Sequence, residues 1–194
     1  MEEITSRDNK KIKHIVQLYK RKYRTTHQEF VAEGYRTVID MLPTGTVRYV
    51  IVNIESIKQE QLDPLLSLCD IYDVQVFSIS DNLWKGIETT VHGQGIIAVV
   101  CQKVHRLEDF RVKENGLYVL IDGVQDPGNL GTLIRTAVGA GVRAMFLTSN
   151  TVDIYNEKTV RSTMSGLCKL PIYTNVTKDS VVKLIKEQGI KLYG

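Results

Sequence analysis

The stretch that decides the fold is LYVLIDGVQDPGNLGTLIRTAVGAGVRAMFLT, residues 117–148. An apolar run stops at a turn containing Gly, Pro and Asp, an amphipathic segment follows, and a second apolar run closes the stretch. This order predicts a strand, a loop, a helix at about residues 129–140 and a second strand. In such units the loop between the first strand and the helix is a common place for a ligand.

The residues before this stretch predict the same alternation. Strands are expected at 29–34, 47–53, 74–80 and 95–101, and helices between them at 35–42, 60–70 and 81–87. We expect Pro64 to interrupt the second of these helices and Asp81 to cap the third. Strands and helices that alternate at this pitch indicate an α/β domain, which would cover residues 1–102.

A charged segment, residues 103–116, predicts a linker with at most a short helix. Beyond it the alternation resumes, with expected strands at 117–121, 143–148, 169–175 and 190–193 and with further helices at 156–166 and 179–188. The span 117–194 is small for a parallel sheet that needs cover on both faces. We therefore expect this second domain to be incomplete, either completed by another chain or continued by further sequence.

Composition indicates an ordinary globular protein. The chain has 194 residues, of which 43% are hydrophobic and 24% charged, so it can bury a sizeable core. It has neither a run of roughly 18 apolar residues nor a secretion signal, which predicts a cytoplasmic protein with no membrane partner. The three cysteines are predicted to be buried, reduced thiols, and the histidines lack metal-ligand spacing: Cys69, Cys101 and Cys168; His14, His27, His92 and His105. No metal site is expected.

The net charge of +3 is small, but residues 9–24 contain seven basic residues and no acid: Lys10, Lys11, Lys13, Lys20, Arg21, Lys22 and Arg24. Apolar residues recur at helical spacing in this segment, which predicts one amphipathic helix with a cationic outer face. Such a face suits a polyanion, although a merely solvated helix flank has the same pattern. Tyr19, Tyr23 and Tyr35 are candidates to stack on unpaired bases, or else core residues.

The loop after residue 121 fits neither common phosphate-binding pattern. Gly123 and Gly128 have P-loop spacing, but Asn129 and Leu130 follow in place of Lys and Ser/Thr, and Asp126 would repel phosphate. The glycines also do not match G-x-G-x-x-G. A Rossmann-like nucleotide enzyme is therefore disfavoured.

The loop does offer the N-terminus of a helix. Asn129 is the expected cap, Gly131 would let another group approach closely, and Arg135 lies less than two turns further on. A shared ligand at this rim and a plain capped helix with a surface arginine are both compatible with these residues.

DGVQDPGNLGTLIRTAVGAG, residues 122–141, closely resembles the first motif of the SpoU, or TrmH, RNA 2′-O-methyltransferases of the SPOUT superfamily, Asp-Pro-x-Asn-x-Gly-x-x-x-Arg-Thr-Ala. Residues 155–172 are similar to the second motif, with Thr163 where serine is frequent and Ser165-Gly166 where Gly-Ala is usual. Residues 4–15, 30–34 and 94–100 resemble the substrate-binding domain that precedes the catalytic domain in many members. The third motif, a Gly-Glu-Gly loop followed by Ser-Leu-Asn, is not found in this sequence.

The resemblance implies a ribosomal-protein-like α/β RNA-binding domain followed by the N-terminal part of an α/β-knot methyltransferase domain, dimeric when full length. It implies methyl transfer from S-adenosylmethionine to a ribose 2′-hydroxyl in rRNA or tRNA. The alternative is an RNA-binding module without catalysis. Without the third motif, the chain as written is expected to hold the cofactor poorly.

The resemblance also assigns residues. Arg135 would activate the hydroxyl beside the methyl donor and engage an RNA phosphate, and Asn129 would shape the site. Thr148 and Leu147 would contact the cofactor. Because a guanidinium stays protonated in proteins, the identity of the base is left open. RNA contacts are expected from the seven basic residues above and from Arg161, for which a salt bridge on the helix surface is an equal alternative.

Overall fold

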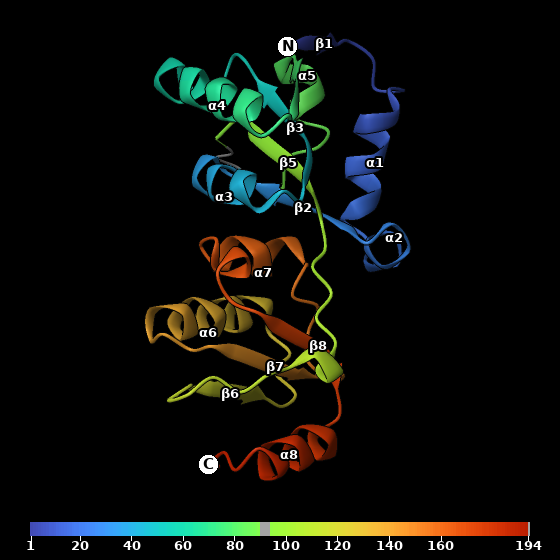
Figure 1. Ribbon diagram of the computed structural model, residues 1–194. Coiled ribbons are helices and arrows are strands. Elements are labelled where there is room, and N and C mark those ends of the chain that lie inside the picture. The colour runs from blue at the N-terminus through green and yellow to red at the C-terminus, as the bar shows by residue number, and fades with distance from the viewer. Residues whose placement is uncertain (90–93, 194) are drawn as a thin grey trace.

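The computed structural model describes residues 1–89 and 94–193, which form two β-sheets with their own helices (Figure 1). His92 lies outside the described residues. The first sheet contains β1 (Glu2–Ile4), β2 (Glu29–Glu33), β3 (Val47–Asn53), β4 (Gln75–Ile79) and β5 (Ile96–Cys101). Its order is β1-β4-β3-β5-β2, with β1, β4 and β3 parallel and β5 antiparallel to both of its neighbours.

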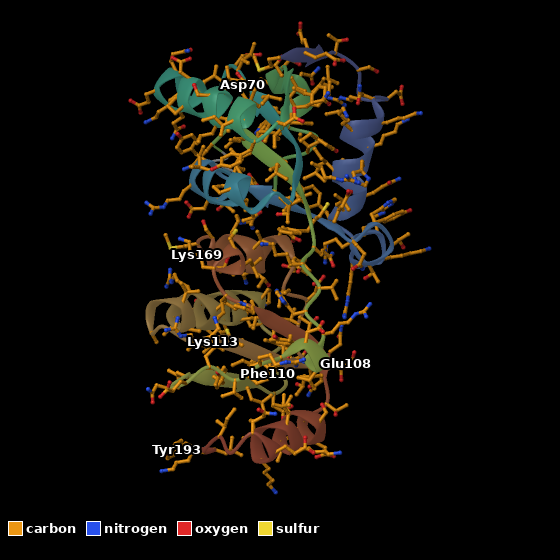
Figure 2. All side chains as sticks on the ribbon, in the orientation of Figure 1. Asp70, Glu108, Phe110, Lys113, Lys169 and Tyr193 are labelled. Atoms are coloured by element: carbon orange, nitrogen blue, oxygen red, sulfur yellow. The ribbon has the colours of Figure 1, made fainter. Side chains whose placement is uncertain are left out.

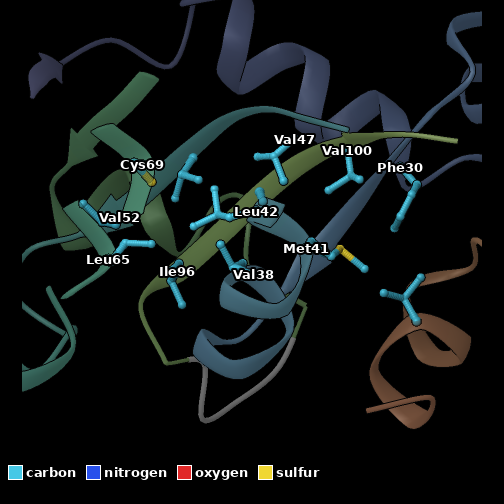
Figure 3. Close-up of a cluster of buried hydrophobic side chains, with 14 of the residues drawn as sticks. Phe30, Val38, Met41, Leu42, Val47, Val52, Leu65, Cys69, Ile96 and Val100 are labelled. Carbon is cyan, nitrogen blue, oxygen red and sulfur yellow. The ribbon is translucent and has the colours of Figure 1, made fainter. Parts of the chain in front are cut away.

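Helices cover both faces of the first sheet because its strands are apolar on both faces. In β3, Val50 and Val52 pack on one side with α3 (Tyr35–Met41) and α4 (Gln59–Ile71), whereas Ile51 packs on the other. That second side is covered by α1 (Lys10–Leu18) and α5 (Asp81–Trp84). Figure 3 shows the first of these cores, in which Val38, Leu42 and Ile96 are buried.

The second sheet is a parallel sheet of β6 (Tyr118–Ile121), β7 (Ala144–Thr148) and β8 (Ile172–Val176). One face packs against α6 (Pro127–Gly139) and is sealed by Leu130 and Ile134. The opposite face packs against α8 (Lys178–Glu187) and against Phe110 of the connecting segment. The α/β class predicted from the alternating pattern is confirmed.

Helix α7 (Glu157–Ser162) forms the layer between the two sheets (Figure 1). It packs on α6 and also on the edge strand β2, and Val160 belongs to the core of the first sheet. Gly131 makes the α6 contact possible, because a Cβ atom there would lie 2.4 Å from the Ser162 Cβ. The close approach predicted at Gly131 is therefore made by a helix of the same chain.

The connecting segment is more than a linker. It contains a 3-10 turn at Leu107–Asp109, as the prediction of at most a short helix allows. Phe110 follows it, beside the second sheet (Figure 2). Its side chain is 6% exposed and packs against Phe146, Tyr118 and Tyr173. The connecting segment is thus fixed to the face of the second sheet that α8 also covers.

The three cysteines are free, as predicted, but only Cys69 is fully buried, since Cys101 and Cys168 are half-buried. Burial raises the pKa of Cys69 and of Cys168 to about 11, so both remain thiols at neutral pH.

Within residues 1–89 and 94–193, no helix has the length and apolar content needed to cross a membrane.

Three helix predictions in the first half are wrong in detail. Residues 9–24 do not form one helix, because α1 ends at Leu18 and α2 (Arg21–His27) begins after an extended Lys20. Pro64 does not interrupt α4, which continues because Leu65 and Cys69 are buried one turn apart on the sheet. Asp81 lies in the first turn of α5, and the N-cap position is Ser80.

Two predictions in the second half also fail. The helix expected at 156–166 ends at Ser162, since Met164 and Ser165 have φ angles of 46° and 70°. Residues 190–193 were expected to begin a strand and instead have no regular structure, because no described strand pairs with them. Strand β1 was not predicted at all.

Ser165 has an unfavourable backbone conformation, and a single substitution should relieve it. Ser165 is fully buried, and its hydroxyl has no hydrogen-bond partner among residues 1–89 and 94–193. Its left-handed backbone favours glycine, which is the usual residue at this position of the second motif. Ser165→Gly should raise the free energy of unfolding by about 1 kcal/mol, measured by urea denaturation. Ser165→Ala, which removes the hydroxyl and keeps the strain, should gain less; an equal or larger gain from alanine would contradict the strain argument.

Candidate functional site

A cleft lies where α2 meets the carboxyl ends of β7 and β8. It contains a cavity of about 210 Å³ and an adjoining hollow of about 570 Å³. The residues that line both are Arg21, Arg24, Thr151, Val152 and Asp153. Ligands of open α/β sheets bind outside the carboxyl ends of parallel strands, so this cleft is the first candidate for a binding site.

Arg24 and Asp153 join the two sides of the cleft. Arg24 Nε and Nη2 donate to Asp153 Oδ2 at 3.0 and 2.8 Å, and the two side chains are only 5% and 17% exposed. Arg24 Nη1 also donates to the carbonyl oxygens of Leu18 and Tyr19 at 2.9 and 2.8 Å. One guanidinium therefore satisfies the carboxyl end of α1 and links α2 to the second sheet.

The loop that presents Asp153 is fixed by its own contacts. Asp153 Oδ1 accepts from the Tyr155 amide at 2.9 Å, and the Val152 amide donates to the Val124 carbonyl at 2.9 Å. The Tyr155 hydroxyl donates to the Lys103 carbonyl at 3.0 Å, and burial raises the pKa of Tyr155 to about 12, so the donor proton is retained. The carboxylate is thereby held in place for Arg24.

The cleft is cationic. Arg21 and Lys103 line it with exposed side chains, and neither has an ion-pair partner among residues 1–89 and 94–193. Asp153 is the only carboxylate among the described lining residues, and Arg24 neutralises it. An anionic ligand would thus meet two unpaired cations and no uncompensated negative charge.

A polar network lies at the carboxyl edge of the second sheet, next to the cleft. The Gly123 amide donates to the Thr148 hydroxyl at 3.2 Å, and that hydroxyl lies 3.1 Å from Asp122 Oδ1 and contacts the Asn150 side chain. A hydrogen bond from Lys178 at 3.3 Å lowers the pKa of Asp122, and the Thr148 hydroxyl adds to this effect. Leu147 and Thr148, the predicted cofactor contacts, are both buried and line the cavity.

The cap of α6 is Asp126 and not Asn129, which corrects the prediction. The helix begins at Pro127, whose fixed φ suits the first helical position, and Asp126 Oδ1 accepts from the Asn129 amide at 2.7 Å. This bond, followed by the charge of Lys158, lowers the pKa of Asp126. The side chain of Asn129 is left exposed in the first turn.

Arg135 lies further along α6 with an exposed side chain. Its Nη1 lies 3.2 Å from the Met164 sulfur, in the left-handed turn after α7. Neither Arg135 nor Asn129 lines the cleft described above. The structure therefore does not bring these two residues together with Leu147 and Thr148 in one cavity of a single chain.

The predicted RNA-binding cations occupy different environments. Lys10, Lys20, Arg21 and Lys22 are exposed, and no ion pair involves them within the described part of the chain. Lys13 pairs with Asp8 at 2.7 Å, and the ammonium of Lys11 lies 4.5 Å from the centre of the Phe77 ring. Arg24 is buried in its pair with Asp153 and is not on the outer face.

Arg161 makes the salt bridge that was the alternative to an RNA contact. Its Nη1 lies 3.6 Å from Glu33 and donates to the Thr89 hydroxyl at 2.6 Å. Two of the three candidate stacking tyrosines are also structural, since Tyr19 donates to the Ile87 carbonyl and Tyr35 packs on the first core. Tyr23 stacks on His27.

Sequence reasoning missed Asp153, Gln102 and Lys103. Gln102 donates to the carbonyls of Arg24 and Glu29 at 3.1 and 3.2 Å, which fixes the start of the connecting segment beside α2. A local signal existed only for Asp153, because an aspartate two residues before Tyr155 suits an Asx turn. Its pairing with Arg24, far away in sequence, had no local signal.

The fold and the motifs define an RNA methyltransferase class, and comparisons with known proteins identify the family. Residues 116–194 match the SpoU rRNA Methylase family, and residues 9–98 match the MRM3-like substrate binding domain. The chain is 33% identical over its full length to the 23S rRNA (guanosine(2553)-2′-O)-methyltransferase RlmP of Bacillus subtilis, of which it spans 73%. The chain belongs to the SpoU rRNA methylase family.

Other relatives agree. The chain is 29% identical to the mitochondrial rRNA methyltransferase 3 of Xenopus laevis, with 89% of this chain aligned and 42% of the relative spanned. The crystal structure of an AdoMet-bound rRNA methyltransferase from Sinorhizobium meliloti superposes with a TM-score of 0.83 at 28% identity, covering 96% of this chain and 69% of that one. The SPOUT fold implied by the motifs is confirmed by this likeness.

The Arg24–Asp153 pair should be critical for stability. Arg24→Ala should lower the free energy of unfolding by about 3–5 kcal/mol, because a buried carboxylate and two helix-end carbonyls lose their partner. Guanidinium denaturation measures the change. Lys183→Ala, which breaks the exposed pair with Glu187, is the matched control and should leave stability unchanged. Equal small effects from both variants would show that the buried pair does not hold the cleft.

Proposed function

We propose that this protein transfers the methyl group of S-adenosylmethionine to a ribose 2′-hydroxyl in rRNA. Family membership and the rRNA methyltransferase activity for which the relatives are named support the reaction type. The observation that carries the proposal is the exposure of Asn129 and Arg135 on α6, the helix that starts from the carboxyl edge of the second sheet. Among the described residues, Arg135 makes its one side-chain hydrogen-bond contact with the Met164 sulfur and has no ion-pair partner, so its guanidinium is available to bind a substrate anion.

The residues at that edge fit S-adenosylmethionine. Leu147 and Val124 supply apolar surface for the adenine ring, and Asp122, Thr148 and Asn150 supply polar groups for hydroxyl and amino groups. When bound, the cofactor supplies an electrophilic methyl group on a sulfonium. We propose Leu147 and Thr148 as its nearest contacts in this chain.

Arg135 would act as a cation and not as a base. Because a guanidinium stays protonated in proteins, it can donate hydrogen bonds to an RNA phosphate and to the 2′-oxygen as negative charge develops there. Asn129, at the first turn of the same helix, would orient the ribose. These two contacts would hold the hydroxyl in line for transfer, which accounts for much of the rate in two-substrate reactions.

We propose that the active form is a homodimer. Leu133 on α6 and Met164 beside Arg135 are 39% and 61% exposed, which leaves apolar surface around the proposed catalytic arginine. A second copy covering this surface would complete a cavity around Arg135. In this arrangement residues 1–102 bind RNA, residues 117–194 carry the catalytic site, and the free thiols suit the reducing cytoplasm.

Replacing Arg135 tests the reaction. Arg135→Ala should lower kcat for transfer of labelled methyl groups to rRNA by at least about 100-fold, because an oxyanion and phosphate donor is lost. Arg143→Ala removes another exposed arginine, which lies outside the site, and should leave kcat within about 2-fold. If this protein binds rRNA but forms no 2′-O-methylated product, it is a non-catalytic RNA-binding module and the proposal fails.

The exposed cations of α2 and its N-terminus should set the salt dependence of RNA binding. Lys20→Gln with Lys22→Gln should weaken binding to structured rRNA and reduce the slope of log K against log salt by about 1 to 2, since each phosphate contact contributes about 0.9. Lys186→Gln with Lys191→Gln, on and after α8, makes the same charge change elsewhere and should not alter the slope. An equal change in the slope for both double variants would contradict this prediction, because it would show that the slope follows net charge and not the position of the cations.

A further inference from the structure

We propose that the cleft between α2 and the second sheet binds an unpaired RNA nucleotide, with its phosphate on Arg21 and Lys103. This inference rests on the proposed function and names a substrate subsite for it. The cleft is distinct from the exposed outer cations of Lys10, Lys20 and Lys22, none of which lines it.

The charge of the cleft favours a phosphate ligand. Arg21 lies on α2 and Lys103 on the connecting segment, so the two unpaired cations approach the same cavity from different elements. Pairing with Arg24 removes the repulsion that Asp153 would otherwise exert on an anion. Leu147 and Thr148, the proposed cofactor contacts, line the same cavity. Because S-adenosylmethionine carries a net positive charge, Arg21 and Lys103 disfavour it on their side of the cleft and favour a phosphate there.

The size and lining of the cleft favour one nucleotide over a duplex. The cavity of about 210 Å³ and the adjoining hollow of about 570 Å³ together match a small-ligand pocket, which spans about 300–1,000 Å³. An A-form helix cannot insert into such a space, whereas the base of an unpaired nucleotide can. Gln28, Thr174 and Asn175 supply neutral donors and acceptors that could meet a base edge.

The cleft also leads toward the proposed catalytic helix. The hollow is lined by Gln125 and Asn156, and Gln125 directly precedes Asp126, the cap of α6. A strand held at Arg21 would therefore leave the cleft beside the turn that carries Asn129. The nucleotide in the cleft is a neighbour of the methylated one and sets which unpaired segment can reach the site.

The test compares single-stranded and hairpin RNA of equal length by fluorescence anisotropy with the whole chain. Arg21→Gln with Lys103→Gln should weaken binding of the single strand at least 10-fold and binding of the hairpin by less than 3-fold. Both side chains are exposed, so the fold should be retained, which circular dichroism checks. The matched control is Lys186→Gln with Lys191→Gln, which should change neither affinity more than 2-fold.

Equal losses of affinity for the single strand and the hairpin, or the same losses in the control variant, would contradict the proposed subsite. Calorimetric titration with S-adenosylmethionine adds a second arm, in which the cleft variant and the unchanged chain should show the same weak affinity for the cofactor. A cofactor affinity that falls with the cleft variant would assign the cleft to the cofactor and refute the proposal. Loss of methyl transfer with Arg135→Ala reports on the proposed function alone, so the two ideas can fail separately.

Discussion

One largely buried ion pair joins the two sheets at the cleft. Arg24 gives up its hydration only because Asp153 and the carbonyls of Leu18 and Tyr19 together accept four hydrogen bonds from it. The break between α1 and α2 follows from the same contact, since the chain must turn at Lys20 for the guanidinium to reach back to the end of α1. Because Asp153 belongs to the loop after β7, the geometry of the first unit is transmitted to the carboxyl edge of the second.

The Arg24–Asp153 pair places two surfaces of different chemistry side by side. The edge of the second sheet offers a polar network around Thr148, whereas the facing side of the cleft offers the free cations Arg21 and Lys103. Helix α6 starts at the same edge and extends away from it toward Met164, which separates Arg135 from the cleft. An RNA that spans the cleft and this helix would contact both units of the chain at once.

Much of the fold could be predicted from sequence because local patterns decide it. Short apolar runs identified β3, β5 and β7, and the Asp-Pro turn with its following apolar stripe identified α6. Where tertiary contacts overrule local preference, prediction failed. Pro64 stays inside α4 because Leu65 and Cys69 are buried on the sheet, and the end of α1 depends on Arg24 reaching back to Leu18.

The candidate site was predictable only in part for the same reason. The motif located Asn129 and Arg135 in sequence, yet the cleft is built from residues far apart in the chain, Gln102 and Asp153 among them. Cation count alone could not distinguish Arg24, which is consumed by an internal pair, from Arg21, which remains exposed. Only the folded structure shows which of the two arginines is paired.

Photocrosslinking gives the most direct test of this account. Single-stranded rRNA containing 4-thiouridine, irradiated in complex with the protein and digested for mass spectrometry, should crosslink to peptides that contain Tyr155 or residues 102–104, which border the cleft. Crosslinks confined to α4 or α8, with none at the cleft, would contradict the claim that the two units hold RNA between them.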